Sequence, residues 1–217
     1  MISQRVAVFI DGFNLYHAID NLRFPELKWV DLRSLSRVFI NTSVEQLEDV
    51  FYFSAYAGHV SQAAQERQKR YLKALELTGI KTVLGHFKEK DRKCPSCSHR
   101  WIGHEEKETD VNIALHLLYL AFRDSFDRAL VISNDSDLAP AIQMVRKSFP
   151  KKRITTVAPP NYYHSNLLIK VSSDKARIRI EHLERCLLPE VITDPSRHIL
   201  VTRPKEYARE RIESQKR

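Results

Sequence analysis

Short, continuous apolar runs alternate along this chain with longer segments of helical periodicity. The runs predict strands over residues 5–10, 49–56, 80–87, 129–133, 153–158 and 176–180. The periodic segments predict helices over residues 31–40, 61–78, 110–122, 137–149 and 181–188. Strands that are apolar throughout are usually covered on both faces. The pattern therefore predicts an α/β fold, a three-layer sandwich with a mostly parallel central sheet.

The length of 217 residues suits one domain with a real core. We expect that domain to span residues 1–190, with a small cysteine-containing insert at about residues 88–106. Residues 191–217 are rich in charge and predict a helical C-terminal extension or a frayed tail.

The net charge of +8 favours a polyanionic partner. Only five glycines are present, and neither G-x-G-x-x-G nor G-x-x-x-x-G-K-[ST] occurs. The two common glycine-rich phosphate loops are therefore excluded. No apolar run is long enough to span a bilayer, and three cysteines do not suggest a disulfide framework, so we expect a cytoplasmic protein without a membrane segment.

Acidic residues stand at the ends of two predicted strands and at the start of one predicted helix. Asp11 follows the first strand, Asp135 and Asp137 follow the strand at 129–133, and Asp110 opens a helix. Because the carboxyl ends of parallel strands meet at one edge, we expect these carboxylates to gather there, with Asn14 close to Asp11.

Gathered carboxylates repel one another unless a cation neutralises them. Hard oxygen ligands suit Mg²⁺ or Mn²⁺, which activate water and stabilise charge on a phosphoryl oxygen. On a basic protein the matching substrate is a nucleic-acid phosphodiester. Each aspartate taken alone is equally well explained as a turn former or a helix cap. An aspartyl-phosphate phosphatase is disfavoured because Phe13 stands where its second aspartate is needed.

Three segments carry a family resemblance. Residues 9–16 (FIDGFNLY), 107–114 (KETDVNIA) and 131–138 (VISNDSDL) resemble the signature blocks of the NYN domain family, within the PIN-like nuclease superfamily. The resemblance implies a metal-dependent ribonuclease of α/β sandwich fold. It implies that Asp11, Asp110 and Asp135 hold the metal.

The same resemblance implies that Asn14 and Asp137 complete the pocket and that Ser133 and Asn134 shape its wall. Many relatives have glycine at the position of Asn134. The superfamily often uses one more acidic residue, and the choice between Glu106, Glu108 and neither stays open.

The segment around the two neighbouring cysteines has two readings of equal weight. Cys94, Cys97, His99 and His104 would supply four donors for structural zinc. The spacing is cramped, and a reduced cysteine pair in a surface hairpin explains the segment equally well. Redox activity or zinc shared between molecules carries less weight. Cys186 follows an amphipathic pattern and is expected in the core.

Basic and aromatic residues supply candidate RNA contacts. The preferred basic group, Lys88, Lys90, Arg92 and Lys93, leads into the cysteine segment. The densest cluster comprises Arg146, Lys147, Lys151, Lys152 and Arg153, and a solvated helix end explains it equally well. Four aromatic residues are candidates for stacking on unpaired bases: Tyr16, Trp101, Tyr162 and Tyr163. In a domain of this size, however, an aromatic side chain more often packs in the core or at its rim.

Together these residues predict an endoribonuclease that hydrolyses RNA through a water activated by carboxylate-bound Mg²⁺ or Mn²⁺. The alternative is a non-catalytic RNA-binding or regulatory module with a degenerate pocket. Single-stranded and structured RNA are both open as substrates, and so is a homodimer.

Overall fold

The computed structural model describes residues 3–208, and a seven-stranded sheet runs through them. Its strands are β1 (Gln4–Asp11), β2 (Glu45–Ala55), β3 (Lys81–Lys93), β4 (Arg100–Lys107), β5 (Arg128–Ile132), β6 (Arg153–Ala158) and β7 (Asp174–Arg177). The helices are α1 (Gly12–Asp20), α2 (Leu32–Arg37), α3 (Gln62–Leu77), α4 (Thr109–Phe122), α5 (Ala139–Ser148), α6 (Asn166–Val171) and α7 (Ile180–Arg185).

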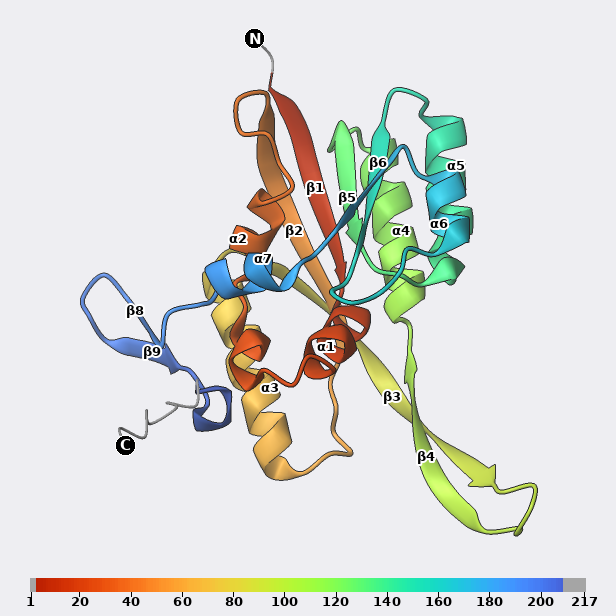
Figure 1. Cartoon of the computed structure of the whole chain (residues 1–217), viewed down its shortest axis with the longest axis vertical. Coiled ribbons are helices and arrows are strands. Elements are labelled where there is room, and N and C mark those ends of the chain that lie inside the picture. The colour runs from red at the N-terminus through yellow and green to blue at the C-terminus, as the bar shows by residue number, and fades with distance from the viewer. Residues whose placement is uncertain (1–2, 209–217) are drawn as a thin grey trace, which may run out of the picture.

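The sheet is mixed but mostly parallel, which confirms the predicted α/β class. Its strand order is β4-β3-β2-β1-β5-β6-β7, and only β4 runs antiparallel to its neighbour. The first strand is central because it pairs in parallel with both β2 and β5. Its carboxyl end meets α1, and the ends of β2 and β5 lie at the same edge (Figure 1).

Alternate residues of β1 enter two separate hydrophobic cores, one on each face of the sheet. Val6, Val8 and Ile10 pack with side chains of α1, α2, α3 and α7. Ala7 and Phe9 pack with side chains of α4, α5 and α6. Successive strand residues point to opposite faces, so an unbroken apolar run needs a helical layer on each side. The result is the predicted three-layer arrangement (Figure 1).

Of two elements beside the site, α1 was not predicted from the sequence, whereas the hairpin agrees with one of the two interpretations of the cysteine segment. Helix α1 begins directly after Asp11, whose side chain caps it, and it buries Leu15, Ala18 and Ile19. The expected cysteine insert is a long antiparallel hairpin in which β3 continues to Lys93 and β4 returns. This β3–β4 hairpin extends well beyond the rest of the sheet (Figure 1).

The C-terminal extension differs from the predicted helix. After α7, the strands β8 (Val191–Thr193) and β9 (Ile199–Thr202) form an antiparallel hairpin, and a short 3-10 helix, η3, covers Lys205–Tyr207. Leu188 and Val201 pack with buried Trp29, and the indole Nε1 of Trp29 donates to the Pro189 carbonyl at 2.9 Å. These apolar anchors hold the segment extended, whereas its charge pattern had suggested helix. The rest of the predicted tail, from residue 209, lies outside the described residues.

We expect Phe9→Ala to lower the free energy of unfolding by about 3–5 kcal/mol, because it would open a cavity in the core. The Phe9 ring is fully buried, with its centre 5.6 Å from that of Phe51 and 6.1 Å from that of Phe126. Phe122→Ala is the control because Phe122 is 76% exposed, and its effect should stay within about 0.5 kcal/mol. Urea denaturation measures both, and equal losses would contradict the assigned core.

Candidate active site

The carboxyl edge of the sheet brings together acidic residues from distant parts of the chain. Asp11 ends β1, Asp135 caps the 3-10 helix η2 (Ser136–Leu138) after β5, and Asp110 lies in the first turn of α4. They line one cavity of about 390 Å³, hereafter the acidic cavity. Its other lining residues are Phe13, Asn14, His17, Glu106, Thr109 and Tyr162.

The carboxylate of Asp11 is buried and held at both oxygens. The backbone N–H of Asn14 donates to Asp11 Oδ1 at 3.0 Å, and the hydroxyl of Ser133 donates to Oδ2 at 2.8 Å. The backbone N–H of Asp135 in turn donates to the Ser133 hydroxyl at 3.0 Å. This chain of hydrogen bonds joins the end of β1 to the loop after β5.

Asn14 connects the same two segments at a second point. Its Oδ1 accepts from the backbone N–H of Asn134 at 3.0 Å, and Asn134 Oδ1 accepts from the N–H of Ser165 at 2.7 Å. Ser133 and Asn134 therefore lie behind the acidic residues and support them, whereas Asn14 also lines the acidic cavity.

The structure distinguishes between the two glutamates that the sequence left open. Glu106 lines the acidic cavity, and its Oε1 accepts from both the N–H (3.1 Å) and the hydroxyl of Thr109. Glu108 instead faces His86, with 3.3 Å between Oε2 and Nδ1. Asp137 is exposed and does not line the cavity, but its backbone N–H donates to Asp135 Oδ1 at 2.9 Å.

The cavity accumulates negative charge. Burial raises the pKa of Asp110 to about 6, and repulsion from Asp135, Asp11 and Glu106 adds to the effect. Burial also raises the pKa of Asp11, although the hydrogen bonds from Asn14 and Ser133 oppose that rise. Among the described residues, the cavity lining includes no lysine or arginine. His17, one turn after Asn14 on α1, lines it too and was not singled out in the sequence.

The donor set suits a hydrated hard cation. Within residues 3–208, no group of three or more His, Cys, Asp or Glu side chains converges closely enough to enclose a metal by itself. Mg²⁺ usually keeps several waters and takes only one or two carboxylates directly. Asp11, Asp110, Asp135 and Glu106, spaced around an open cavity, fit that mode of binding.

The four candidate zinc donors are not brought together. Cys94 and Cys97 lie at the turn of the β3–β4 hairpin, where hydrogen bonds from the backbone of Cys97 and Ser96 lower the pKa of the Cys94 thiol. His104 pairs with Glu89 further down the hairpin, and its ring stacks on His59 with centres 4.2 Å apart. His99 stacks on Trp101. The predicted core position of Cys186 is confirmed.

The basic residues divide into two groups. Lys88, Lys90, Arg92 and Lys93 are exposed along β3 beyond the cavity, and Lys90 pairs with Glu105 at 3.0 Å. In the denser cluster, Arg146 donates to two backbone carbonyls, buried Lys152 pairs with Asp124 at 2.6 Å, and Arg153 pairs with Asp174 at 2.7 Å. That cluster spans the end of α5 and the start of β6, at the opposite edge of the sheet, and its contacts are structural.

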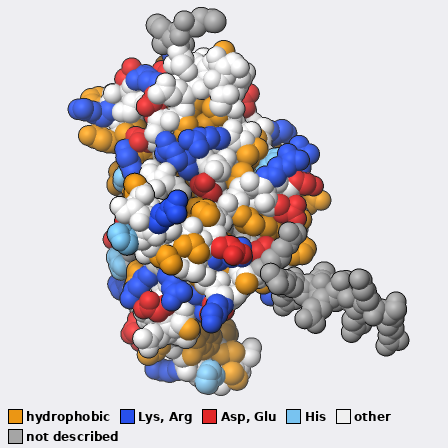
Figure 2. Space-filling model, turned by 90° about the vertical axis from the view of Figure 1, so that its left-hand side faces the viewer, with side chains coloured by type: hydrophobic (Ala, Val, Ile, Leu, Met, Phe, Trp, Pro, Cys, Tyr) orange, Lys and Arg blue, Asp and Glu red, His pale blue; other side chains and the backbone are white. Residues whose placement is uncertain are grey.

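Lysine and arginine side chains are also spread over the face that carries α2, α3 and α7, among acidic and hydrophobic ones (Figure 2). Among the predicted stacking residues, Tyr162 lines the acidic cavity, whereas Tyr163 is 85% exposed and lies beside Arg177. Tyr16 lines an adjoining cavity.

A mostly parallel sheet between helical layers, with acidic residues at the strands' carboxyl edge, is consistent with the PIN-like fold. The NYN domain model matches residues 5–174, and the chain belongs to the NYN domain family. This membership confirms the resemblance of the three signature segments and implies a nuclease that acts on RNA.

Two further comparisons found one similar protein sequence and one similar solved structure. The 6-hydroxy-3-succinoylpyridine 3-monooxygenase HspA of Pseudomonas putida is 29% identical, over 87% of this chain and 71% of its own. A crystal structure of a protein of unknown function from Vibrio parahaemolyticus aligns with a TM-score of 0.55 and 18% identity, covering 86% of this chain and 97% of the other. The latter likeness supports the fold alone.

No helix within residues 3–208 has the length and apolar character needed to cross a membrane.

We expect Asp110→Asn to raise the melting temperature in EDTA at pH 7.5, because it removes a charge that its neighbours repel. The pKa of Asp110 in the folded protein, about 6, exceeds its ordinary value of 3.8. The folded protein therefore loses stability as pH rises from about 4 to about 6, and the ionised carboxylate stays destabilising above that range. The gain should vanish near pH 4. Thermal unfolding at both pH values measures it, and an equal gain at pH 4 would contradict the electrostatic cause.

Proposed function

We propose that this protein is a metal-dependent endoribonuclease that hydrolyses RNA phosphodiester bonds at the acidic cavity. The observation that carries the proposal is the gathering of Asp11, Asp110, Asp135 and Glu106 around one open space with no lining lysine or arginine among the described residues. The raised pKa of Asp110 supports it, because the protein maintains a repulsive arrangement that a cation would relieve.

In this proposal Asp11, Asp110 and Asp135 hold the cation, and Glu106 is the further acidic residue. Asp11 is the best oriented of these, since both of its oxygens accept hydrogen bonds from the surrounding chain. When bound, Mg²⁺ or Mn²⁺ lowers the pKa of water and stabilises charge on a phosphoryl oxygen.

Asn14 and Ser133 act as positioning residues for the carboxylates. Each connects the start of α1 to the loop after β5, so the loss of either would change the spacing of Asp11 and Asp135. Asp137 contributes through its backbone N–H, which orients the Asp135 carboxylate, while its own side chain is exposed.

The substrate class is supported by the net charge of +8 and by the basic residues of the β3–β4 hairpin. The base of that hairpin supplies Glu106 to the acidic cavity, so its exposed lysines extend from the cleavage site. The name of the Pseudomonas relative describes oxygenation of a substituted pyridine. We do not propose that reaction for this chain, because the gathered carboxylates are the groups that phosphodiester hydrolysis uses.

Asp135→Asn is expected to slow RNA cleavage on the order of 100-fold or more, because it removes one ligand charge. Labelled single-stranded and structured RNA would be incubated with Mn²⁺, with Mg²⁺ or with EDTA. Asp174→Asn is the matched control, since Asp174 begins β7 at the opposite edge of the sheet, and it should leave cleavage unchanged.

Cleavage in EDTA, or equal cleavage by Asp135→Asn and wild type, would overturn the nuclease mechanism. RNA binding by the wild type without cleavage under any metal condition would favour the non-catalytic module instead.

The hairpin contacts can be tested by the salt dependence of RNA binding, measured with Ca²⁺ replacing the catalytic metal. Replacing both Lys88 and Lys93 with alanine should reduce the slope of log K against log salt by about 1.4, the value for two phosphate contacts on a single strand. The control pair, Lys147→Ala with Lys151→Ala, lies at the opposite edge and should leave the slope unchanged. Equal effects of the two pairs would contradict an RNA path along the hairpin.

A further inference from the structure

A second cavity, of about 520 Å³, adjoins the acidic cavity and shares Phe13, His17 and Glu106 with it. We call it the aromatic pocket. It lies between α1, the end of β2, α3 and the base of the β3–β4 hairpin, and Tyr207 of η3 also lines it. Its volume is in the range of ordinary small-ligand sites. The function proposed above does not account for it.

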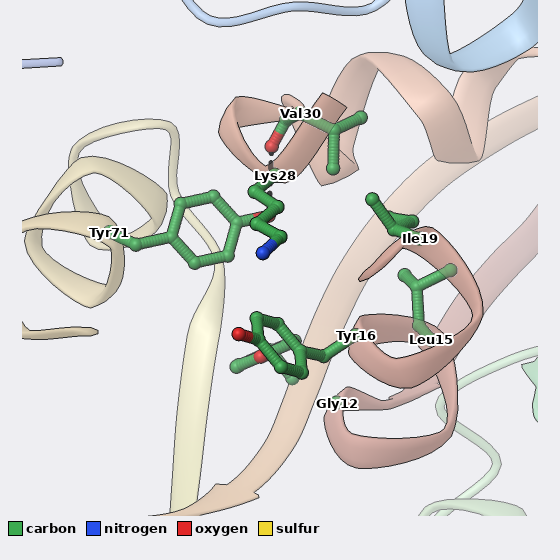
Figure 3. A pocket seen from close by; sticks show the side chains of 8 residues that line it. Gly12, Leu15, Tyr16, Ile19, Lys28, Val30 and Tyr71 are labelled. Carbon is green, nitrogen blue, oxygen red and sulfur yellow. Dashed lines mark hydrogen bonds between the residues drawn. The ribbon is translucent and has the colours of Figure 1, made fainter. Parts of the chain in front are cut away.

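Phenylalanine and tyrosine rings line several sides of the aromatic pocket. Tyr16, Tyr52 and Tyr71 line one part, and Phe13 and Phe87 line another. Two edge-to-face contacts stabilise the wall, with ring centres 6.3 Å apart for Tyr52 and Tyr71 and 5.6 Å apart for Phe13 and Phe87. The Tyr71 hydroxyl donates to the Val30 carbonyl at 2.9 Å, which fixes that ring in place (Figure 3). Rings held in this way offer preformed faces for a flat ligand.

Gly12 is required for this wall. A Cβ at Gly12 would lie 2.6 Å from Cζ of Tyr52 and 2.5 Å from the Phe53 carbonyl oxygen. Only glycine therefore lets the Tyr52 ring pack against the first turn of α1. Gly12 directly follows Asp11. The start of α1 therefore contributes Asp11 to the acidic cavity and Gly12 to the aromatic pocket.

Two cationic side chains line the pocket, and each is paired with a carboxylate, Lys28 with Asp20 at 2.5 Å and Arg67 with Glu206. The Lys28 ammonium is 5.4 Å from the centre of the Tyr16 ring, beside a narrow recess that Tyr71 and Ile19 also line (Figure 3). Arg67 lines the pocket as well and pairs with Glu206 at 3.0 Å. Because both cations already have partners, the feature that the pocket offers to a ligand is its set of aromatic faces, which suits a planar ring.

The remaining side is closed by the loop after β2. The His59 ring stacks on His104 and also contacts Phe87, with centres 4.5 Å apart. Gln68 holds this loop, because its Nε2 donates to the Ala55 carbonyl at 2.8 Å and its Oε1 accepts from the Ala57 N–H at 3.1 Å. Ser54 and His59 add further polar groups to the lining.

We propose that the aromatic pocket binds the base of one unpaired nucleotide next to the scissile phosphate. The proposal rests on the ribonuclease function proposed above, because the shared wall of Phe13, His17 and Glu106 puts a bound base directly beside the acidic cavity. A planar ring could also belong to a free aromatic acid, so the test includes both sources. The nucleotide is favoured because the cleavage site adjoins the pocket.

The test is calorimetric titration of the full chain in EDTA with uridine 5′-monophosphate, adenosine 5′-monophosphate and nicotinate. Ala64 lines the pocket, so Ala64→Trp would fill it. Ala63→Trp is the matched control, because Ala63 is the preceding residue of α3, is exposed and is not part of the lining. Tyr16→Ala, which removes one stacking face, gives a second variant should Ala64→Trp fail to fold.

We expect at least one nucleotide to bind the wild type and Ala63→Trp equally. Its Kd should rise about tenfold or more in Ala64→Trp and in Tyr16→Ala, as loss of a stacked base predicts. The inference is overturned by the absence of saturable nucleotide binding, by an unchanged Kd in the folded pocket variants, or by binding of nicotinate alone.

Failure of the base pocket can be distinguished from failure of the ribonuclease function, because titration in EDTA measures nucleotide binding without any cleavage. A wild type that cleaves RNA with Mn²⁺ but binds no nucleotide would retain the nuclease function and overturn the base pocket. A wild type that binds nucleotide in a manner sensitive to Ala64→Trp but cleaves no RNA would support the pocket and overturn the nuclease function.

Discussion

The hydrogen bond between the Ser133 hydroxyl and the buried Asp11 carboxylate joins the two central strands where the acidic cavity begins. Burial disfavours the charged form of Asp11, so its oxygens need partners, and Ser133 and the Asn14 N–H supply them at 2.8 and 3.0 Å. The same serine accepts from the Asp135 N–H. The start of α1 and the loop after β5 are therefore held in register with one another, and the other parts of the site assemble around this junction.

The two cavities have opposite character although they share a wall. One is surrounded by carboxylates whose mutual repulsion helps to raise the pKa of Asp110, and the other is lined by aromatic rings with Lys28 and Arg67 nearby. The first turn of α1 separates them, with Asp11 on one side and Tyr16 on the other. An RNA strand bound across this turn would have its phosphate and its base in environments suited to each.

Much of the acidic site could be predicted from the sequence because the end of an apolar run marks the end of a buried strand. Asp11 and Asp135 directly follow apolar runs, and parallel pairing then requires them to meet. Glu106 could not be chosen over Glu108 on this basis, since both lie between elements. In the structure Glu106 lies near the end of β4 and lines the cavity, whereas Glu108 has a positive φ and faces His86. The zinc donors could not be tested from the sequence because their distances depend on the register of the β3–β4 hairpin. That register pairs His104 with Glu89 and so separates it from the cysteines at the turn.

The sequence by itself determined the layers and the edge at which the carboxylates gather, because apolar periodicity and strand ends are local properties of the chain. The tertiary fold determined the aromatic pocket, which takes residues from α1, β2, α3, the β3–β4 hairpin and η3. It also turned the expected C-terminal helix into a hairpin anchored by Leu188 and Val201 on Trp29. The pocket and the hairpin both depend on contacts between residues far apart in the chain. Local periodicity predicts helices and strands, but it does not determine which distant surfaces pack together.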